Sequence, residues 1–207
     1  MIAPAVVQAL QHELVAHLRA RSEWDEFPAL FTVHETEGHG VRLVTVPVPD
    51  LVWAGHGHPP TAVAALAAVA LQLPRYPDGS HLLAMPRAGR LIGAAFRYEA
   101  YALSSDLEAP PVQEAVRRRS VGGSVPRFRD IPGRVEQRCM TAVDLDGGRY
   151  MASSSRLDES KADPTEPIVT YLAFADPKRD KLTGNVVDAT NRFLNAIKPL
   201  PDRRREQ

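Results

Sequence analysis

The spacing of apolar residues predicts three main helices. In the first, apolar residues recur every three or four positions, which is the period of an amphipathic helix packed on a core. Its apolar positions are Val7, Leu10, Leu14 and Leu18. The second opens at Pro59-Pro60-Thr61, where proline suits a first helical turn, and has a face of small residues. The predicted helices cover residues 4–21, 59–73 and 183–198.

Elsewhere, apolar and polar residues alternate, which is the period of a strand with one buried face. The strongest turn signal is Asp146-Gly147-Gly148, between two alternating runs. A further strand is predicted at 168–174. The predicted hairpins pair residues 29–35 with 41–48, 81–86 with 91–103, and 134–145 with 149–155.

This order of elements predicts an α+β fold, in which a mainly antiparallel sheet built from hairpins has three main helices packed on it. The chain has 207 residues, which suits a single domain over residues 1–200. Residues 104–132 are the least regular and are expected to form an insertion. The polar end, residues 201–207, is expected to be a disordered tail.

Charge and cysteine content narrow the class of protein. Lys and Arg together number 25, as do Asp and Glu, so the formal net charge is zero. A dedicated nucleic-acid binder is usually basic, so nucleic acid is not the expected partner, whereas zero net charge favours a homo-oligomer. Cys139 is the only cysteine, which indicates a reducing compartment and a core thiol. With no signal peptide and no apolar run long enough for a membrane, a cytoplasmic protein is expected.

Two histidines, His56 and His58, precede the second helix in what the sequence predicts as an extended loop. Alternate residues of an extended chain point to the same side, so the pair could hold a metal or a phosphate. His34 and His39 could approach from the first hairpin. A metal site needs a third ligand, and no H-E-x-x-H motif is present. We favour a solvated loop and keep a metal-dependent hydrolase as the alternative.

Charged residues alternate along two predicted strands. Arg97 and Glu99 share one face of the first strand, and Glu136 and Arg138 share one face of the second. If the strands are neighbours, the four side chains could form cross-strand ion pairs, each worth about 0.2–1 kcal/mol. We favour a solvent-facing ladder of salt bridges, and the four residues are also candidates for binding a substrate or partner.

A locally basic stretch begins at Arg117, Arg118 and Arg119 and extends to residue 134. It could bind nucleic acid or an acidic partner. Because acidic residues such as Glu114 dilute it, a charged helix face followed by a loop is preferred. Nucleic-acid binding through residues 117–134 is the second alternative.

Four short segments resemble pieces of uncharacterised proteins from actinobacteria and their phages. The resemblance extends from about residue 21 to residue 150. It implies a high-GC bacterial or phage source and no activity, so no functional residue is carried over from it. The segments are Arg21-Ser22-Glu23-Trp24-Asp25-Glu26, His58-Pro59-Pro60-Thr61-Ala62-Val63, Ala95-Phe96-Arg97-Tyr98-Glu99-Ala100-Tyr101 and Arg134-Val135-Glu136-Gln137-Arg138.

The sequence contains no recognisable set of acid, base, nucleophile and metal ligands. We therefore expect a non-enzymatic intracellular binding or regulatory protein with a protein partner, encoded by a bacterium or a phage, with no cofactor and no catalytic residue. The Gly-rich, Arg-flanked insertion at 104–132 is of a kind that often serves recognition.

Overall fold

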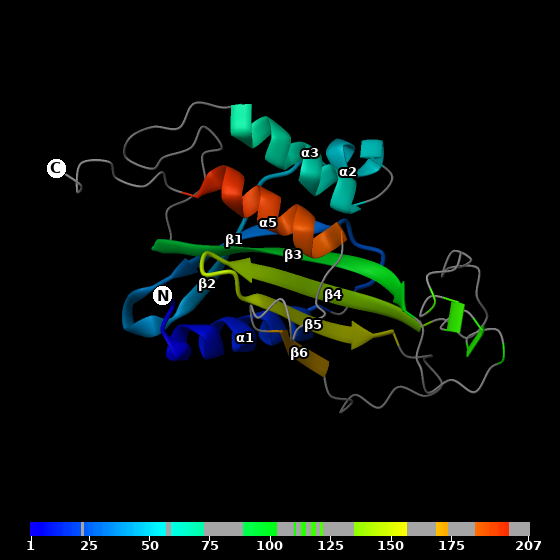
Figure 1. Cartoon of the computed structure of the whole chain (residues 1–207), viewed down its shortest axis with the longest axis horizontal. Helices are drawn as coiled ribbons and strands as arrows, with labels where there is room; N and C mark the ends of the chain where they lie inside the picture. Colours follow the sequence, from blue (N-terminus) through cyan, green and yellow to red (C-terminus); the bar gives the residue numbers. More distant parts are fainter. Residues whose placement is uncertain are drawn as a thin grey trace.

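Six strands of the computed structural model form one antiparallel sheet, with helices on both of its faces (Figure 1). The strand order is β2-β1-β3-β4-β5-β6, and every neighbouring pair is antiparallel. The predicted α+β class is therefore confirmed. The structure describes residues 1–21, 23–56, 59–72, 89–102, 110, 113–114, 117–118, 121, 135–156, 169–173 and 185–198.

The three main helices lie where the apolar spacing predicts them, and a short helix and a 3-10 turn accompany them. The strands are β1 (Ala29–Glu35), β2 (Val41–Thr45), β3 (Arg90–Ala102), β4 (Val135–Asp144), β5 (Arg149–Ser155) and β6 (Val169–Ala173). The helices are α1 (Pro4–Arg19), α2 (Asp50–His56), α3 (Pro59–Gln72) and α5 (Asn185–Ile197), and the 3-10 turn is η1 (Glu37–His39).

Two of the three predicted hairpins are confirmed, namely β1 with β2 and β4 with β5. The strand β2 ends at Thr45 instead of residue 48, just before Pro47, which lacks the N–H that a ladder needs. The third predicted hairpin is wrong, because the strand β3 pairs with β1 on one edge and with β4 on the other over residues 93–97, which leaves no edge there for residues 81–86. Its predicted hairpin partner, 81–86, and the tail 201–207 lie outside the described residues, and the insertion 104–132 is described only at isolated residues.

Both faces of the sheet are covered (Figure 1). The helices α3 and α5 cover one face, where Phe96, Leu30 and Phe193 belong to one core cluster. The helix α1 covers the other, where its buried side packs near Met140 and Ala95 in a second cluster. The buried positions of α1 are Val6, Leu10, Leu14 and Leu18.

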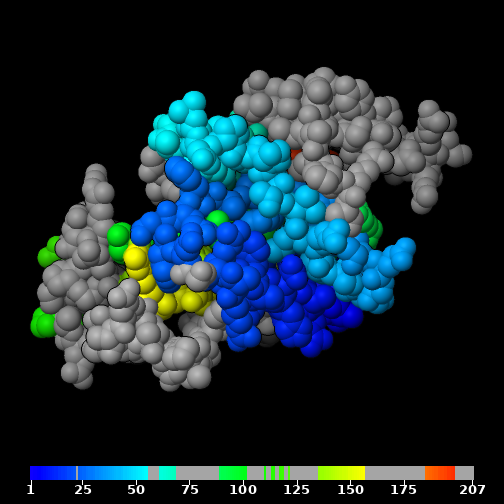
Figure 2. Space-filling view, turned by 180° about the vertical axis from the view of Figure 1, so that it is seen from behind, coloured from blue at the N-terminus to red at the C-terminus, as the bar shows by residue number. Residues whose placement is uncertain are grey.

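The view from behind shows the N-terminal part of the chain, in dark and lighter blue, covering much of the α1 face (Figure 2). Because side chains alternate along a strand, Arg97 and Glu99 point to the same face as Ala95. These two charged residues of β3 therefore point toward the α1 layer. None of the described helices combines the length and apolar character needed to span a bilayer.

Candidate functional site

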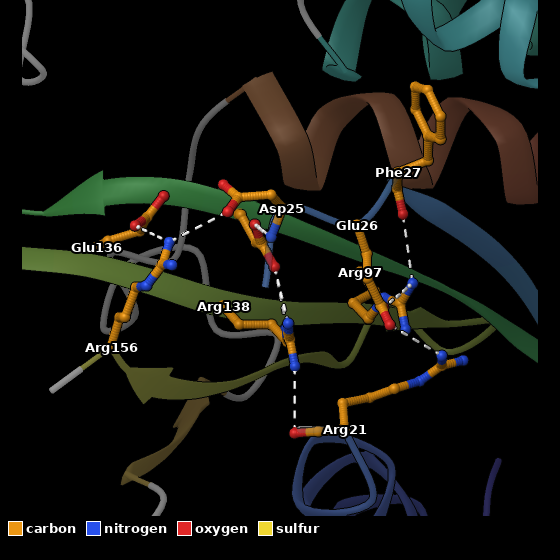
Figure 3. A network of polar contacts seen from close by, with 9 residues as sticks. Arg21, Asp25, Glu26, Phe27, Arg97, Glu136, Arg138 and Arg156 are labelled. Carbon is orange, nitrogen blue, oxygen red and sulfur yellow. Dashed lines mark hydrogen bonds and ion pairs between the residues drawn. The ribbon is translucent and has the colours of Figure 1, made fainter. Parts of the chain in front are cut away.

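A network of charged side chains gathers where the chain between α1 and β1 crosses β3, β4 and β5 (Figure 3). We call residues 23–28 of this connection the Trp24 segment. Inward and outward positions alternate along it, with Trp24, Glu26 and Pro28 partly buried. The exposed positions are Glu23, Asp25 and Phe27.

Arg138 on β4 is the most deeply buried cation of the network, with 3% of its side chain exposed. Its Nε and Nη2 donate to Glu99 Oε1 at 3.1 and 2.9 Å, and its Nη1 donates to the Arg21 carbonyl at 3.3 Å. Its guanidinium carbon lies 4.7 Å from the centroid of the Trp24 ring. The other oxygen of Glu99 accepts the backbone N–H of Asp25 at 2.9 Å. The Glu99–Arg138 pair thereby ties the Trp24 segment to the sheet.

Arg97 on β3 makes the second anchor, and 7% of its side chain is exposed. Its Nη2 lies 2.9 Å from Glu26 Oε2 and donates to the Phe27 carbonyl at 3.3 Å. Arg21 donates from Nη1 to the other Glu26 oxygen at 3.2 Å. The Glu26 carboxylate is thus held between a strand arginine and an arginine that follows α1.

Arg156, which follows β5, makes the third anchor. Its Nη1 donates to Glu136 Oε2 at 2.9 Å and to Asp25 Oδ2 at 3.4 Å. Its guanidinium carbon lies 5.4 Å from the Trp24 ring centroid. Two guanidinium groups, those of Arg138 and Arg156, therefore contact the same indole, an arrangement that the negative face of an aromatic ring favours.

One group of three acidic residues in the described part of the chain has the spacing of metal ligands. A carboxylate oxygen from each of Asp25, Glu99 and Glu136 lies within 4.8 Å of the others. Arg156 already binds two of these carboxylates, and Arg138 binds the third. Each of the three carboxylates is therefore already paired with an arginine of the chain, and two arginines face three acids.

Of the predicted ladder of cross-strand salt bridges, one pair is confirmed. The prediction that the ladder faces solvent is wrong. Glu99 and Arg138 face each other across β3 and β4 and form an ion pair. In the same register Arg97 faces Met140, and Glu136 faces Tyr101. The remaining charges therefore pair with residues outside the two strands, namely Glu26 and Arg156. Arg97 and Arg138 do not face solvent.

Sequence reasoning missed the residues of the Trp24 segment that complete the network, Trp24, Asp25 and Glu26. The one local signal was an acidic stretch around a tryptophan, in a segment that breaks the helical pattern.

The cations and carboxylates of the network balance in number. They are Arg21, Arg97, Arg138 and Arg156 against Asp25, Glu26, Glu99 and Glu136.

His17 on α1 lies in the electric field of this network. Burial lowers the pKa of its imidazole to about 4, and the nearby charges of Arg97, Arg21 and Arg138 act in the same direction, against Glu26. Among the described residues, the buried side-chain atoms without a hydrogen-bond partner are His17 Nε2, Glu26 Oε2 and Arg97 Nη1. The ion pair of Glu26 with Arg97 compensates charge at the last two atoms.

Acidification is expected to destabilise the protein partly through His17. The unfolded chain binds a proton at this residue below its ordinary pKa of about 6.5, whereas the folded chain binds it only near pH 4. Neutral His17 therefore contributes to the free energy of unfolding above about pH 6.5, and this contribution is lost as the pH falls to about 4. Because the side chain is only partly buried, solvent screening limits the effect to about 1 kcal/mol.

Urea unfolding of the wild type and a His17→Gln variant, at about pH 7 and about pH 4.5, measures this contribution. The loss of unfolding free energy between the two pH values should be smaller in the variant. Equal losses in the two proteins would contradict the assignment of this pH dependence to His17.

Two of the four histidines considered for a metal site, His34 and His39, have other partners. His34 is buried, with Nε2 2.9 Å from Thr32 Oγ1 and Nδ1 3.3 Å from the Gly89 carbonyl. His39 is exposed, and its Nδ1 lies 3.2 Å from Glu35 Oε1. The two histidines therefore have separate partners.

The predicted extended loop at residues 54–58 is wrong in its first part, because α2 includes residues 54–56. Burial of Trp53, which contacts Phe96, accompanies this helical turn. With His56 at the end of a helix, the extended spacing assumed for the two histidines no longer applies. The side chain of His56, and the whole of His58, lie outside the described residues.

In the described part of the basic stretch, an acidic residue pairs with the arginines. Arg117 and Arg118 are exposed, and both donate to Glu114, from Nε at 2.8 and 2.7 Å. Arg119 lies outside the described residues. Nucleic-acid binding through residues 117–134 stays a prediction, and Arg117 and Arg118 provide less net positive charge than their number suggests.

Cys139 lies on β4 in the face toward α3 and α5 and is buried. Burial raises the pKa of its thiol to about 11, so the reactive thiolate is scarce near neutral pH. This agrees with the expected core thiol.

Comparison with known proteins gives no relative, since no family, no curated protein and no solved structure matches the chain. Its function is therefore inferred from the geometry of the described residues.

Proposed function

We propose that the chain is a non-enzymatic binding protein that recognises a protein partner through the Trp24 segment. One observation carries this proposal. The inward side of the segment is anchored at Trp24, Asp25 and Glu26, while its outward side presents the phenyl ring of Phe27 with 53% of the residue exposed. In Figure 3 the ring points away from Arg97.

An exposed aromatic side chain on a held loop has the properties of a binding anchor. Aromatic residues are enriched in the cores of interfaces and among the residues that dominate binding energy. Holding the loop in its bound shape lowers the entropy that association would otherwise cost. Phe27 combines both properties, because its own carbonyl accepts a hydrogen bond from Arg97.

The backbone of the segment supports the same interpretation. Asp25 has a φ of 62°, in the left-handed region that a residue other than glycine adopts at a cost. The carboxylate of Glu99 accepts its N–H and helps to hold this conformation. Backbone conformations of this kind persist where surrounding contacts impose them, and they cluster at functional sites such as ligand clamps.

In this proposal the charged strand residues support the binding loop instead of contacting the partner. Arg97 and Arg138 are buried under the segment and already have partners. Glu99 and Glu136 accept hydrogen bonds from the segment and from Arg156. The location inside cells, expected from the single cysteine, stays a prediction.

Selection from a random peptide library tests the proposal, because it requires no particular partner to be chosen beforehand. Peptides enriched on the wild-type protein should bind a Phe27→Ala variant about 30-fold more weakly, because loss of an aromatic anchor costs about 2 kcal/mol or more. Fluorescence anisotropy with labelled peptides gives the two dissociation constants, and circular dichroism shows whether the variant is folded.

Leu145→Ala is the matched control. Leu145 is also an exposed apolar residue, 40% exposed, but it follows the far end of β4 from Arg138, roughly 20 Å away at the rise of a strand. Its variant should bind the peptides as the wild type does. Peptides that bind Phe27→Ala with wild-type affinity would overturn the proposal. So would failure to select any peptide from a protein that turns over esters or phosphodiesters.

A further inference from the structure

The outward side of the Trp24 segment has a chemical character of its own. Its exposed residues are two acids and one phenylalanine, namely Glu23, Asp25 and Phe27. We infer that the partner presents a basic peptide segment, in which an apolar side chain is flanked by Lys or Arg. This inference rests on the proposed binding function and specifies the chemistry of the partner.

Two cations of the network, Arg97 and Arg138, are buried, whereas Arg21 and Arg156 have 41% and 42% of their side chains exposed and are paired with carboxylates of the network. Arg21 is paired with Glu26, Arg97 with the same carboxylate, and Arg138 with Glu99. Asp25, by contrast, has 75% of its side chain exposed, and its ion pair with Arg156 spans 3.4 Å.

Glu23 is exposed and takes no part in the ion pairs that anchor the segment. Two exposed acids, Glu23 and Asp25, therefore precede the exposed ring of Phe27 along the segment. Complementary charge steers a partner and selects against the wrong one, which predicts a basic partner here. The phenyl face can also accept a cation directly.

Two matched synthetic peptides test this inference. Both have a central leucine, which lysines flank in one peptide and glutamates flank in the other. The lysine peptide should bind the wild type at least about tenfold more tightly than the glutamate peptide, and its affinity should fall as salt is added, because screening weakens exposed charge pairs. Fluorescence anisotropy over a range of salt concentrations gives both results.

A double variant, Glu23→Gln with Asp25→Asn, isolates the contribution of the acids. Asparagine accepts the left-handed conformation of residue 25 as readily as aspartate does, so the segment keeps its shape. The preference for the lysine peptide should shrink to roughly threefold or less as the complementary charge is lost. Glu37→Gln, which removes an exposed acid beyond the opposite end of β1, should leave the preference unchanged.

The outcomes separate this inference from the proposed function. The two peptides could bind equally, or the glutamate peptide could bind better, while binding still depends on Phe27. In that case the inference of a basic partner is wrong and the proposed binding function stands. If neither peptide binds, the basic partner is likewise wrong, and the library selection decides the binding function. If the lysine peptide binds Phe27→Ala as well as it binds the wild type, both proposals are overturned.

Discussion

Replacing Arg138 with alanine should lower the free energy of unfolding by about 3–5 kcal/mol, the range found when one partner of a buried ion pair is removed. Arg138 is almost completely buried, and its guanidinium donates twice to Glu99. Without it, Glu99 would be a carboxylate, only 15% exposed, facing no cation across the two strands. The carbonyl of Arg21 would also lose its donor, and the Trp24 ring would lose one of its guanidinium contacts.

Urea unfolding measures this loss, and a second variant tests its cause. Arg138→Met combined with Glu99→Gln removes both charges and keeps an acceptor oxygen near the N–H of Asp25. The double variant should lose less stability than Arg138→Ala alone, because no buried charge is left unpaired. Arg118→Ala removes an exposed arginine that is also paired and should have a much smaller effect.

If Arg138→Ala costs no more than Arg118→Ala, the buried network does not hold the protein together. If it costs the expected amount, the Trp24 segment should also lose its fixed position. Peptides that depend on Phe27 should then bind more weakly, although Arg138 does not touch them. This result would identify Arg138 as a residue that positions the binding loop.

Much of the fold was predictable because it depends on local periodicity. The helices α1, α3 and α5 follow from apolar residues at helical spacing, and the hairpin of β4 and β5 follows from Asp146-Gly147-Gly148. A cross-strand pair among Arg97, Glu99, Glu136 and Arg138 was predicted on the condition that the two strands are neighbours, and the register that selects Glu99 and Arg138 was not. Alternation along a strand shows which residues share a face.

Alternation does not show whether a face is covered, and here the expectation of a solvent-facing ladder was wrong. The helix α1 and the Trp24 segment cover the charged face of β3 and β4, so its arginines are buried. The contact between Asp25 and Glu99 joins positions 74 residues apart. A local pattern cannot predict such a contact, because it depends on how the whole chain packs. The helix α2 was missed because only seven residues form it, too few for a periodic signal.

The second large effect is expected on the opposite face of the sheet, at Phe96. Its side chain is completely buried, and its ring centroid lies 5.5 Å from Tyr98 and 5.9 Å from Trp53. Phe96→Ala should lower the free energy of unfolding by about 3–5 kcal/mol, through lost burial and the cavity left between these rings. Phe96→Leu should cost clearly less, because it leaves a smaller cavity. Equal losses in the two variants would show that the stability does not depend on how much of the space around Phe96 is filled.

Comparing the two large-effect variants separates stability from binding. Phe96 and Arg97 are adjacent on β3 and point to opposite faces, so Phe96→Ala leaves the anchors of the Trp24 segment untouched. At low temperature, where both variants are folded, Phe96→Ala should bind Phe27-dependent peptides with wild-type affinity, and Arg138→Ala should not. If both lose affinity equally, binding depends on overall stability, and the Trp24 segment has no special role in it.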